Sequence, residues 1–269
     1  MKRLIYTAIF GGYDIVYPPI EADPDVDYVI FTDDPQISVP GWRTVPVDMS
    51  SFPTNAAANR YYKTLIHRIL PGYDASIYVD GNIRLLASAA SLFDILHRSG
   101  AALALWRHSG RGTVAEEVDD VIATGKVPDK RARAEYETYR ADGFPDTMPL
   151  GENTIIVRDH NAPKLDAAMS LWWSLYKTHL SRDQLSFGYI VWKTKLELHY
   201  LPGMFRTTNP YVAVYPHLGK GGARPSFVHV SARSHDNSFY FVLLKIWQAK
   251  WRLQRLFRQL LRSIIALRK

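Results

Sequence analysis

The chain has 269 residues, 47% of them hydrophobic and 22% charged, which is typical of one large globular domain or of a domain with an appendage. It contains no cysteine, which excludes disulfides, thiolate zinc sites and cysteine nucleophiles and fits a reducing compartment. The net charge of +7 lies in the tail, because residues 237–269 hold eight basic residues and no acid. Since a nucleic-acid enzyme more often spreads positive charge around its cleft, we expect no nucleic-acid partner.

Short apolar runs alternate with helical patterns along the chain. The predicted strands are Leu4–Phe10, Tyr28–Thr32, Ser76–Asp80, Ala101–Trp106, Thr154–Val157, Leu196–Leu201 and Phe227–Val230. The predicted helices are Asn55–Ile69, Ala90–Ser99, Val114–Thr124, Lys130–Tyr139, Pro163–Thr178, Ser181–Trp192 and the tail. This order predicts an α/β sheet with parallel strands, in which ligands bind at the carboxyl ends of the strands. No run reaches the ~20 apolar residues that span a bilayer, and the first run ends too soon for a signal peptide.

The predicted helix Asn55–Ile69 has two different faces. One face is an apolar stripe at helical spacing, and another carries Arg60, Lys63 and His67. Since the next strand ends at Asp80, this cationic face is suited to holding a diphosphate beside an acidic strand end. A basic helix face that only meets solvent is the alternative.

The segment Asp80-Gly81-Asn82 follows a predicted buried strand and occupies the position of a D-x-D motif. In nucleotide-sugar transferases such oxygen ligands hold a divalent cation that bridges the diphosphate. A simple turn is the alternative, because glycine and asparagine tolerate positive φ. Asn82 is neutral and therefore attracts a cation less strongly than a second carboxylate.

Other polar residues also flank predicted elements. Asp33 and Asp34 end a strand, Glu152 precedes one, Asp183-Gln184 begins a helix, and His229 lies on a short late strand. Each has a structural alternative, such as a solvated strand end or a first-turn acid. The chain has no P-loop and no G-x-G-x-x-G, which argues against an NTPase or a dinucleotide enzyme.

In order, several blocks resemble a glycosyltransferase-like family that includes the plant TOD and MUCI proteins and bacterial cell-surface polysaccharide enzymes. The matching blocks are Tyr6–Asp14, Phe31-Thr32-Asp33, Arg60-x-x-Lys63-x-x-x-His67, Tyr78–Asn82, Arg107-His108 with Glu116-Glu117, Gly143-Phe144-Pro145, and Gly151-Glu152-Asn153 with Arg158. A looser similarity is to lipooligosaccharide galactosyltransferases and glycogenin, through Asp183-Gln184 and His229. The resemblance implies a GT-A fold, a Rossmann-type mixed sheet flanked by helices.

The resemblance also implies roles for individual residues. The nucleotide-sugar site would be Thr7, Ala8, Phe10, Asp33, Arg60, Lys63, Asp80 and Gly81. A cation, Mn²⁺ or Mg²⁺, would be held by Asp80, Asn82 and His229. The groups facing the sugar and the acceptor would be Glu152, Asp183 and Gln184. Whether the anomeric configuration is inverted or retained stays open, because it depends on whether one of these carboxylates deprotonates the acceptor hydroxyl.

The tail, residues 237–269, is a predicted basic amphipathic helix that follows a catalytic domain of residues 1–236. Tryptophans and leucines interleave with lysines and arginines, a pattern typical of a helix lying on an anionic membrane surface. A helix docked on protein is the alternative. We therefore expect a cytoplasmic transferase at the inner face of the membrane, with a nucleotide-sugar donor and a glycan or lipid-linked acceptor in bacterial surface polysaccharide synthesis. A non-catalytic sugar- or nucleotide-binding protein of the same fold is the alternative function.

Overall fold

The computed structural model describes most of the chain, namely residues 1–179, 182–206, 209–215, 217, 230, 233–235 and 237–266. Within helix α8 it describes side chains as far as residue 254. The chain forms two compact units, Met1–Val212 and Ala213–Lys269, and the predicted tail lies within the second. Residues 227–229 of the predicted strand Phe227–Val230, His229 among them, lie outside the described residues.

The first unit is built on a seven-stranded sheet with the order β3-β2-β1-β4-β7-β6-β8. Its strands are β1 (Arg3–Ile9), β2 (Val26–Thr32), β3 (Arg43–Pro46), β4 (Ala75–Val79), β6 (Leu103–Arg107), β7 (Gly151–Asp159) and β8 (Leu198–Tyr200). Two further short strands are β5 (Ile83–Leu85) and β9 (Val212–Val214). The predicted α/β sheet is therefore present, with β3, β5 and β9 in addition to the predicted strands.

Strand β7 differs from its neighbours in direction. The pairs β1–β2, β1–β4, β2–β3 and β6–β8 are parallel, whereas β7 is antiparallel to both β4 and β6. The sheet is therefore mixed, as the family resemblance implies, and β7 is the antiparallel strand among the predicted parallel ones. As a result the first residues of β7 lie at the edge where β1, β4 and β6 end.

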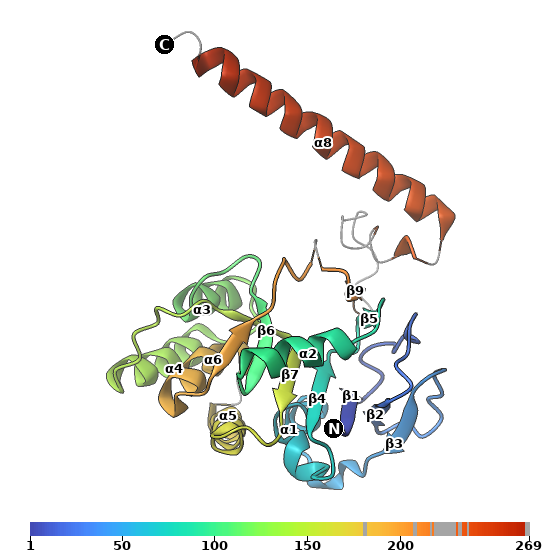
Figure 1. Ribbon diagram of the computed structural model, residues 1–269. Helices are drawn as coiled ribbons and strands as arrows, with labels where there is room; N and C mark the ends of the chain where they lie inside the picture. The colour runs from blue at the N-terminus through green and yellow to red at the C-terminus, as the bar shows by residue number, and fades with distance from the viewer. Residues whose placement is uncertain are drawn as a thin grey trace. The chain divides into compact units, whose positions relative to one another are not determined.

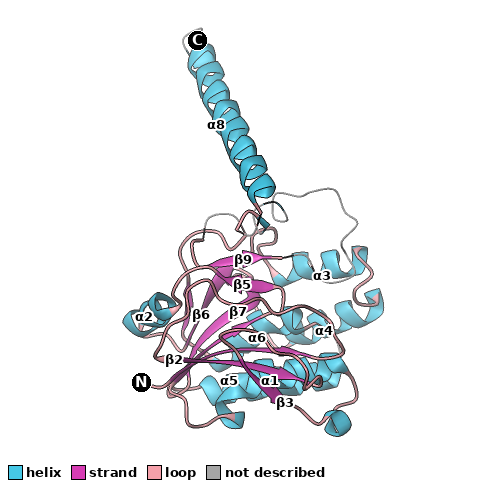
Figure 2. Ribbon diagram, turned by 90° about the vertical axis from the view of Figure 1, so that its right-hand side faces the viewer, coloured by secondary structure: helices cyan, strands magenta, loops and turns pink. Residues whose placement is uncertain are grey.

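Helices cover both faces of this sheet (Figures 1 and 2). Figure 2 shows α2 (Ala90–Ser99) on one side and α1 (Asn55–Ile69), α5 (Leu165–His179) and α6 (Asp183–Thr194) on the other. The short helix η1 (Met49–Ser51) precedes α1, while α3 (Val114–Ala123) and α4 (Asp129–Ala141) pack beside α6. All six predicted helices of this unit are present, and their ends differ from the prediction by at most two residues.

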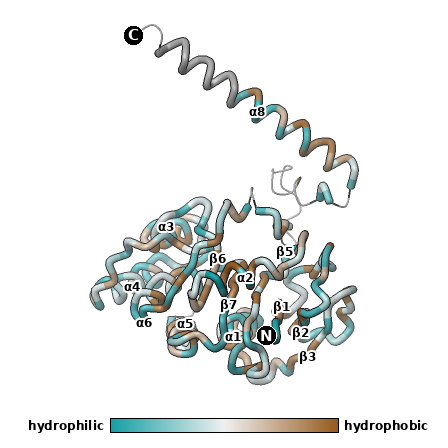
Figure 3. The backbone as a smooth tube through the Cα atoms, in the orientation of Figure 1, coloured by the Kyte–Doolittle hydropathy of each residue, from teal (hydrophilic) through white to brown (hydrophobic). Residues whose placement is uncertain are grey.

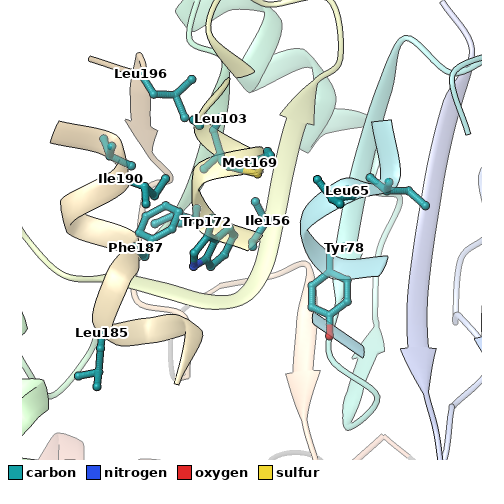
Figure 4. Close-up of a cluster of buried hydrophobic side chains, with 14 of the residues drawn as sticks. Leu65, Tyr78, Leu103, Ile156, Met169, Trp172, Leu185, Phe187, Ile190 and Leu196 are labelled. Atoms are coloured by element: carbon teal, nitrogen blue, oxygen red, sulfur yellow. The ribbon is translucent and has the colours of Figure 1, made fainter. Parts of the chain in front are cut away.

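The core lies on both sides of the central strands and includes large aromatic side chains. Figure 4 shows Trp172, Phe187 and Ile156 gathered where α5, α6 and β7 meet. The indole and the phenyl ring have centroids 5.1 Å apart. Each fully buried side chain of this size contributes roughly 1.5–3 kcal/mol to folding, so α6 is fixed firmly against β7.

The second unit contains α8 (Ser238–Ala266), a helix of 29 residues. Figure 3 shows hydrophobic and hydrophilic residues alternating along its described part. Exposed apolar side chains recur there at helical spacing, namely Phe239, Val242, Ile246 and Leu253. Among the described residues, no helix is both long and apolar enough to cross a membrane.

Candidate functional site

Residues from three separated parts of the chain lie at one edge of the sheet. Asp80 follows β4, and its backbone N–H donates to the carbonyl of Thr154 in β7 at 2.9 Å. Asp33 follows β2 at the same edge, because β1, β2 and β4 are parallel. Glu152 is the second residue of the antiparallel β7, although the sequence predicts that it precedes a strand. The antiparallel direction of β7 therefore brings Glu152 to the same edge of the sheet as Asp33 and Asp80.

The Asp80 carboxylate is held on one side and open on the other. Its Oδ1 accepts a hydrogen bond of 2.7 Å from the Tyr78 hydroxyl and lies 3.8 Å from Lys63 Nζ. The Tyr78 hydroxyl in turn accepts from the Asn59 amide at 3.1 Å. Burial, followed by the charge of Asp80, raises the pKa of Tyr78 well above its usual value, so this hydroxyl stays a donor. The side chain of Asp80 is 30% exposed, which leaves it accessible to a ligand.

Lys63 and Arg60 form a buried ion cluster with Asp183. Lys63 Nζ lies 2.7 Å from Asp183 Oδ2, and Arg60 Nη2 lies 3.1 Å from Asp183 Oδ1. Burial alone would raise the pKa of Asp183, but these two cations outweigh it and hold that pKa below its usual range. Asp183 is therefore a carboxylate at neutral pH. The cationic face of α1 points into the site, so a solvated face is the wrong description of Lys63.

Asp183 and Gln184 begin α6, and both are fixed by neighbouring elements. The indole N–H of Trp172 donates to the Asp183 carbonyl at 2.9 Å. The Gln184 amide donates to the carbonyl of Gly151 at the start of β7. Gln184 thereby ties the first turn of α6 to the strand that carries Glu152. Both residues are buried, which fits a site wall better than a freely solvated helix cap.

Glu152 lies in a second group of polar side chains at the same edge. Its Oε1 accepts from Thr154 Oγ1 at 2.8 Å and lies 3.4 Å from Arg206 Nη2. Its Oε2 lies 4.0 Å from His108 Nε2 and takes no hydrogen bond from the described residues. Burial lowers the pKa of His108, so its imidazole is neutral at pH 7. One Glu152 oxygen is thus available to a ligand.

The residues predicted to form the nucleotide pocket differ in their surroundings. The Asp33 carboxylate accepts from the backbone N–H of Gly11, which lies 3.0 Å from both carboxylate oxygens. The Ala8 carbonyl accepts from Asn59 at 2.6 Å. Phe10 is buried against Tyr62, whereas the Thr7 hydroxyl is buried and has no hydrogen-bond partner among the described residues. Asp33 is the exposed member of this set.

Gly81 separates Asp80 from Asn82 because the backbone there is crowded. A Cβ at position 81 would lie 2.5 Å from Ile9 Cδ1 and 3.0 Å from Asp14 Cβ. The close approach of β1 to this turn, rather than a positive φ, requires glycine.

Replacing Gly81 with alanine is therefore expected to destabilise the protein by about 1–3 kcal/mol, because the added methyl overpacks against Ile9. Gly72→Ala is the matched control, since nothing lies within 4 Å of a Cβ there. Urea unfolding of both variants tests this. Equal midpoints for the two variants would contradict the crowding.

Two of the three predicted metal ligands are described. Asp80 and Asn82 lie together after β4, with Asn82 buried. His229 lies outside the described residues. In the part of the chain that the structure describes, no three His, Cys, Asp or Glu side chains gather as a metal site.

Asn153 is a candidate that the sequence prediction missed. It is buried in β7, and neither its amide nitrogen nor its amide oxygen has a hydrogen-bond partner among the described residues. A buried amide without partners costs about 1–3 kcal/mol, which favours a ligand contact. The sequence has no local signal for this, because the apolar run predicts a strand that begins at Thr154, whereas β7 begins at Gly151 and includes Asn153.

Residues 2–214 match the TOD1/MUCI70, glycosyltransferase-like domain. The chain belongs to this family. It is also 24% identical over 228 residues to the probable hexosyltransferase MUCI70 of Arabidopsis thaliana. This match covers 75% of this chain and 39% of that protein. The TOD1/MUCI70-type chain thus spans about two-fifths of the length of that curated relative. The family resemblance expected from the ordered blocks is confirmed.

Solved glycosyltransferases are similar in backbone at low sequence identity. The apo form of mouse xyloside xylosyltransferase 1 has a TM-score of 0.45 at 10% identity, covering 74% of this chain and 84% of that one. The apo WbbM bifunctional glycosyltransferase has a TM-score of 0.49 at 14% identity, and the match covers 74% of this chain and 38% of that one. The galactosyltransferase LgtC with donor and acceptor sugar analogues has a TM-score of 0.42 at 12% identity, and the match covers 74% of this chain and 72% of that one. The TOD1/MUCI70-type chain has the mixed sheet flanked by helices that the family resemblance implies.

Proposed function

We propose that the chain is a nucleotide-sugar-dependent glycosyltransferase that moves a hexose to a glycan or lipid-linked glycan. The observation that carries the proposal is the pairing of Asp80 with the buried Lys63–Asp183–Arg60 cluster at the edge where the strands end. Membership of a glycosyltransferase-like family and the hexosyltransferase relative support this class of reaction.

The cationic side chains suit the leaving group of such a reaction. Arg60 is partly exposed and faces the edge with its charge fixed by Asp183, so it is assigned to the donor diphosphate. Lys63 is fully enclosed and adds positive potential at the same place. Negative charge builds on the nucleoside diphosphate as the anomeric bond breaks, and fixed cations there stabilise the transition state.

A divalent cation, Mn²⁺ or Mg²⁺, fits the end of β4. The open side of Asp80 and the amide oxygen of Asn82 are hard oxygen donors, and Mg²⁺ is usually bound by one or two carboxylates together with substrate phosphates. When bound, the cation supplies neutralisation of the diphosphate charge. His229 stays a proposed third ligand.

The other two carboxylates of the site, Glu152 and Asp183, have different roles in this proposal. Glu152 has one oxygen that takes no hydrogen bond from the described part of the chain and is assigned to the acceptor side of the site. Asp183 is held as a carboxylate by two cations, and its low pKa makes it a weak base. Asp183 is therefore assigned to orienting Lys63 and Arg60, and Gln184 and Asn153 to contacts with the sugar.

The proposed function is tested with a panel of UDP- and GDP-sugars, with Mn²⁺, Mg²⁺ or EDTA, followed by mass spectrometry of the donor and of membrane extract offered as acceptor. The expected result is metal-dependent consumption of one donor. Donor binding with no consumption in any arm would support the alternative, a non-catalytic sugar- or nucleotide-binding protein.

We also propose that α8 lies on an anionic membrane surface and keeps the enzyme at the cytoplasmic face, near lipid-linked acceptors of bacterial surface polysaccharide synthesis. Its exposed apolar side chains, the excess of basic residues and the absence of acids in residues 237–269 support this.

Removal of residues 237–269 is therefore expected to abolish flotation with vesicles that contain phosphatidylglycerol, since each basic residue near an anionic surface contributes about 1 kcal/mol. The intact chain is expected to float with these vesicles and to float less at high salt. Vesicles of neutral phosphatidylcholine are the control. Equal flotation of the intact and shortened chains would contradict the anchor.

A further inference from the structure

Helix α1 is broken inside the turn that carries the cationic side chains. Leu65 has φ −108° and ψ 18°, outside the helical range, and the Thr64 hydroxyl donates to the Arg60 carbonyl at 2.7 Å. A threonine that bonds back to the carbonyl four residues earlier often bends a helix. The break lies two residues after Lys63, so the geometry of this turn affects where the Lys63 side chain lies.

Two buried side chains from the sheet hold the carbonyls of this turn. The Tyr6 hydroxyl of β1 lies 3.2 Å from the carbonyl oxygens of both Tyr62 and Lys63. Arg158 of β7 donates to the Tyr6 hydroxyl at 2.6 Å and to the Lys63 carbonyl. We call this set the Tyr6–Arg158 clamp. It connects the backbone of Lys63 to the two strands on either side of β4.

The clamp is unusual because Arg158 is fully buried and pairs with no carboxylate in the described part of the chain. Burying a charge without a counter-ion is unfavourable by several kcal/mol unless hydrogen bonds compensate, and an apolar residue of similar size is often as stable. The stability of the core therefore does not explain why an arginine is here. Its Nη1 and Nη2 donate to the Tyr6 hydroxyl and to the Lys63 carbonyl, whereas its Nε has no hydrogen-bond partner among the described residues.

We propose that Arg158 and Tyr6 are positioning residues that fix Lys63 between Asp80 and Asp183. The Lys63 backbone is held by the clamp, and its Nζ then reaches Asp183 at 2.7 Å and Asp80 at 3.8 Å. Arg158 acts through this turn and touches neither the exposed edge nor the proposed donor. The catalytic consequence rests on the proposed glycosyl transfer, whereas the placement of Lys63 does not.

The placement is tested by the rate of reductive methylation of Lys63, followed by mass spectrometry on the full chain. Arg158→Met and Tyr6→Phe are expected to raise this rate at least ~10-fold, because the enclosed amine becomes accessible when the turn loosens. The exposed Lys130 is the internal reference and keeps its rate. Should Arg158→Met fail to fold, Tyr6→Phe, which keeps the ring, decides the question. An unchanged Lys63 rate in a folded variant, or an equal rise at Lys130, would overturn the clamp.

Turnover separates positioning from a merely structural role. If Lys63 is misplaced, kcat is expected to fall by roughly 100-fold with little change in KM, because the lost interaction acts on charge that develops in the transition state. Tyr139→Phe is the matched control: it also removes a buried hydroxyl, which donates to Glu135 at 2.6 Å, and is expected to lower stability and leave kcat unchanged. A kcat in Arg158→Met and Tyr6→Phe equal to that of the wild type would overturn the positioning role. A wild-type chain without turnover would refute the proposed function, and the methylation rates would still decide the clamp.

Discussion

Replacing Asp80 with asparagine is expected to lower glycosyl turnover by at least about 100-fold, the size of effect seen when one preorganised electrostatic group is removed from an active site. Asparagine keeps the shape and can still accept the hydrogen bond from Tyr78. It removes the negative charge that the proposed cation needs and leaves Lys63 with one carboxylate fewer. Turnover of the donor identified in the panel, measured at saturating Mn²⁺, is the readout.

The control for this variant is Asp119→Asn, an acid on α3 whose side chain is 72% exposed and, among the described residues, pairs with Arg133 at 3.5 Å. Asp119→Asn is expected to change stability by less than about 0.5 kcal/mol, because its carboxylate is exposed. Asp80→Asn is expected to lower stability more, because Asp80 accepts from Tyr78 and neighbours the buried Lys63. Thermal unfolding verifies that both variants are folded at the assay temperature. Undiminished turnover in Asp80→Asn and in Asp80→Ala would remove Asp80 from the site.

Asp183→Asn is expected to lower stability by about 3–5 kcal/mol at pH 7, because it leaves the buried Lys63 with the more distant Asp80 carboxylate at 3.8 Å and removes the carboxylate paired with the partly exposed Arg60. The effect depends on pH with a definite sign. The pKa of Asp183 is lower in the folded chain than in the unfolded one, so its stabilisation is present above the unfolded value of about 3.9 and fades as the pH falls below it. Urea unfolding between pH 7 and pH 3 is therefore expected to show the wild type and Asp183→Asn converging in acid.

The double variant Lys63→Met, Asp183→Leu separates stability from function. Apolar residues in place of a buried ion pair often restore stability, so this variant is expected to be more stable than Asp183→Asn and to remain inactive. Recovery of turnover together with stability would show that the ion cluster only supports the fold. An Asp183→Asn protein as stable as the wild type at pH 7 would contradict the buried pair itself.

The elements that the sequence predicted well have strong local signals. Helix α1 begins and ends as predicted because Thr54 caps it through a 3.1 Å bond to the Ala57 N–H and Pro71-Gly72 follows it. The apolar runs of β1 and β4 are buried on both faces of a sheet, and such runs are recognisable without knowledge of their partners.

The elements that were missed lack such signals. Strand β3 is half exposed, contains an arginine and ends in a proline, as is common at a sheet edge, so it has no apolar run to detect. The direction of β7 depends on pairing with β4, whose residues are about eighty positions earlier. The same holds for the site, since the contact between Lys63 and Asp183 joins residues 120 positions apart and no local pattern encodes it.

The place of β7 in the sheet has a consequence for synthesis on the ribosome. This strand inserts between β4 and β6, both of which precede it in the chain. Until residue 159 has emerged, the nascent chain therefore presents two unpaired, largely apolar strand edges, which are templates for misassembly. Such non-local pairing is also slow to form. Shortened products that stop between β6 and β7 should accordingly aggregate, whereas chains that extend through β7 fill the gap between β4 and β6 and complete the edge that carries Asp80.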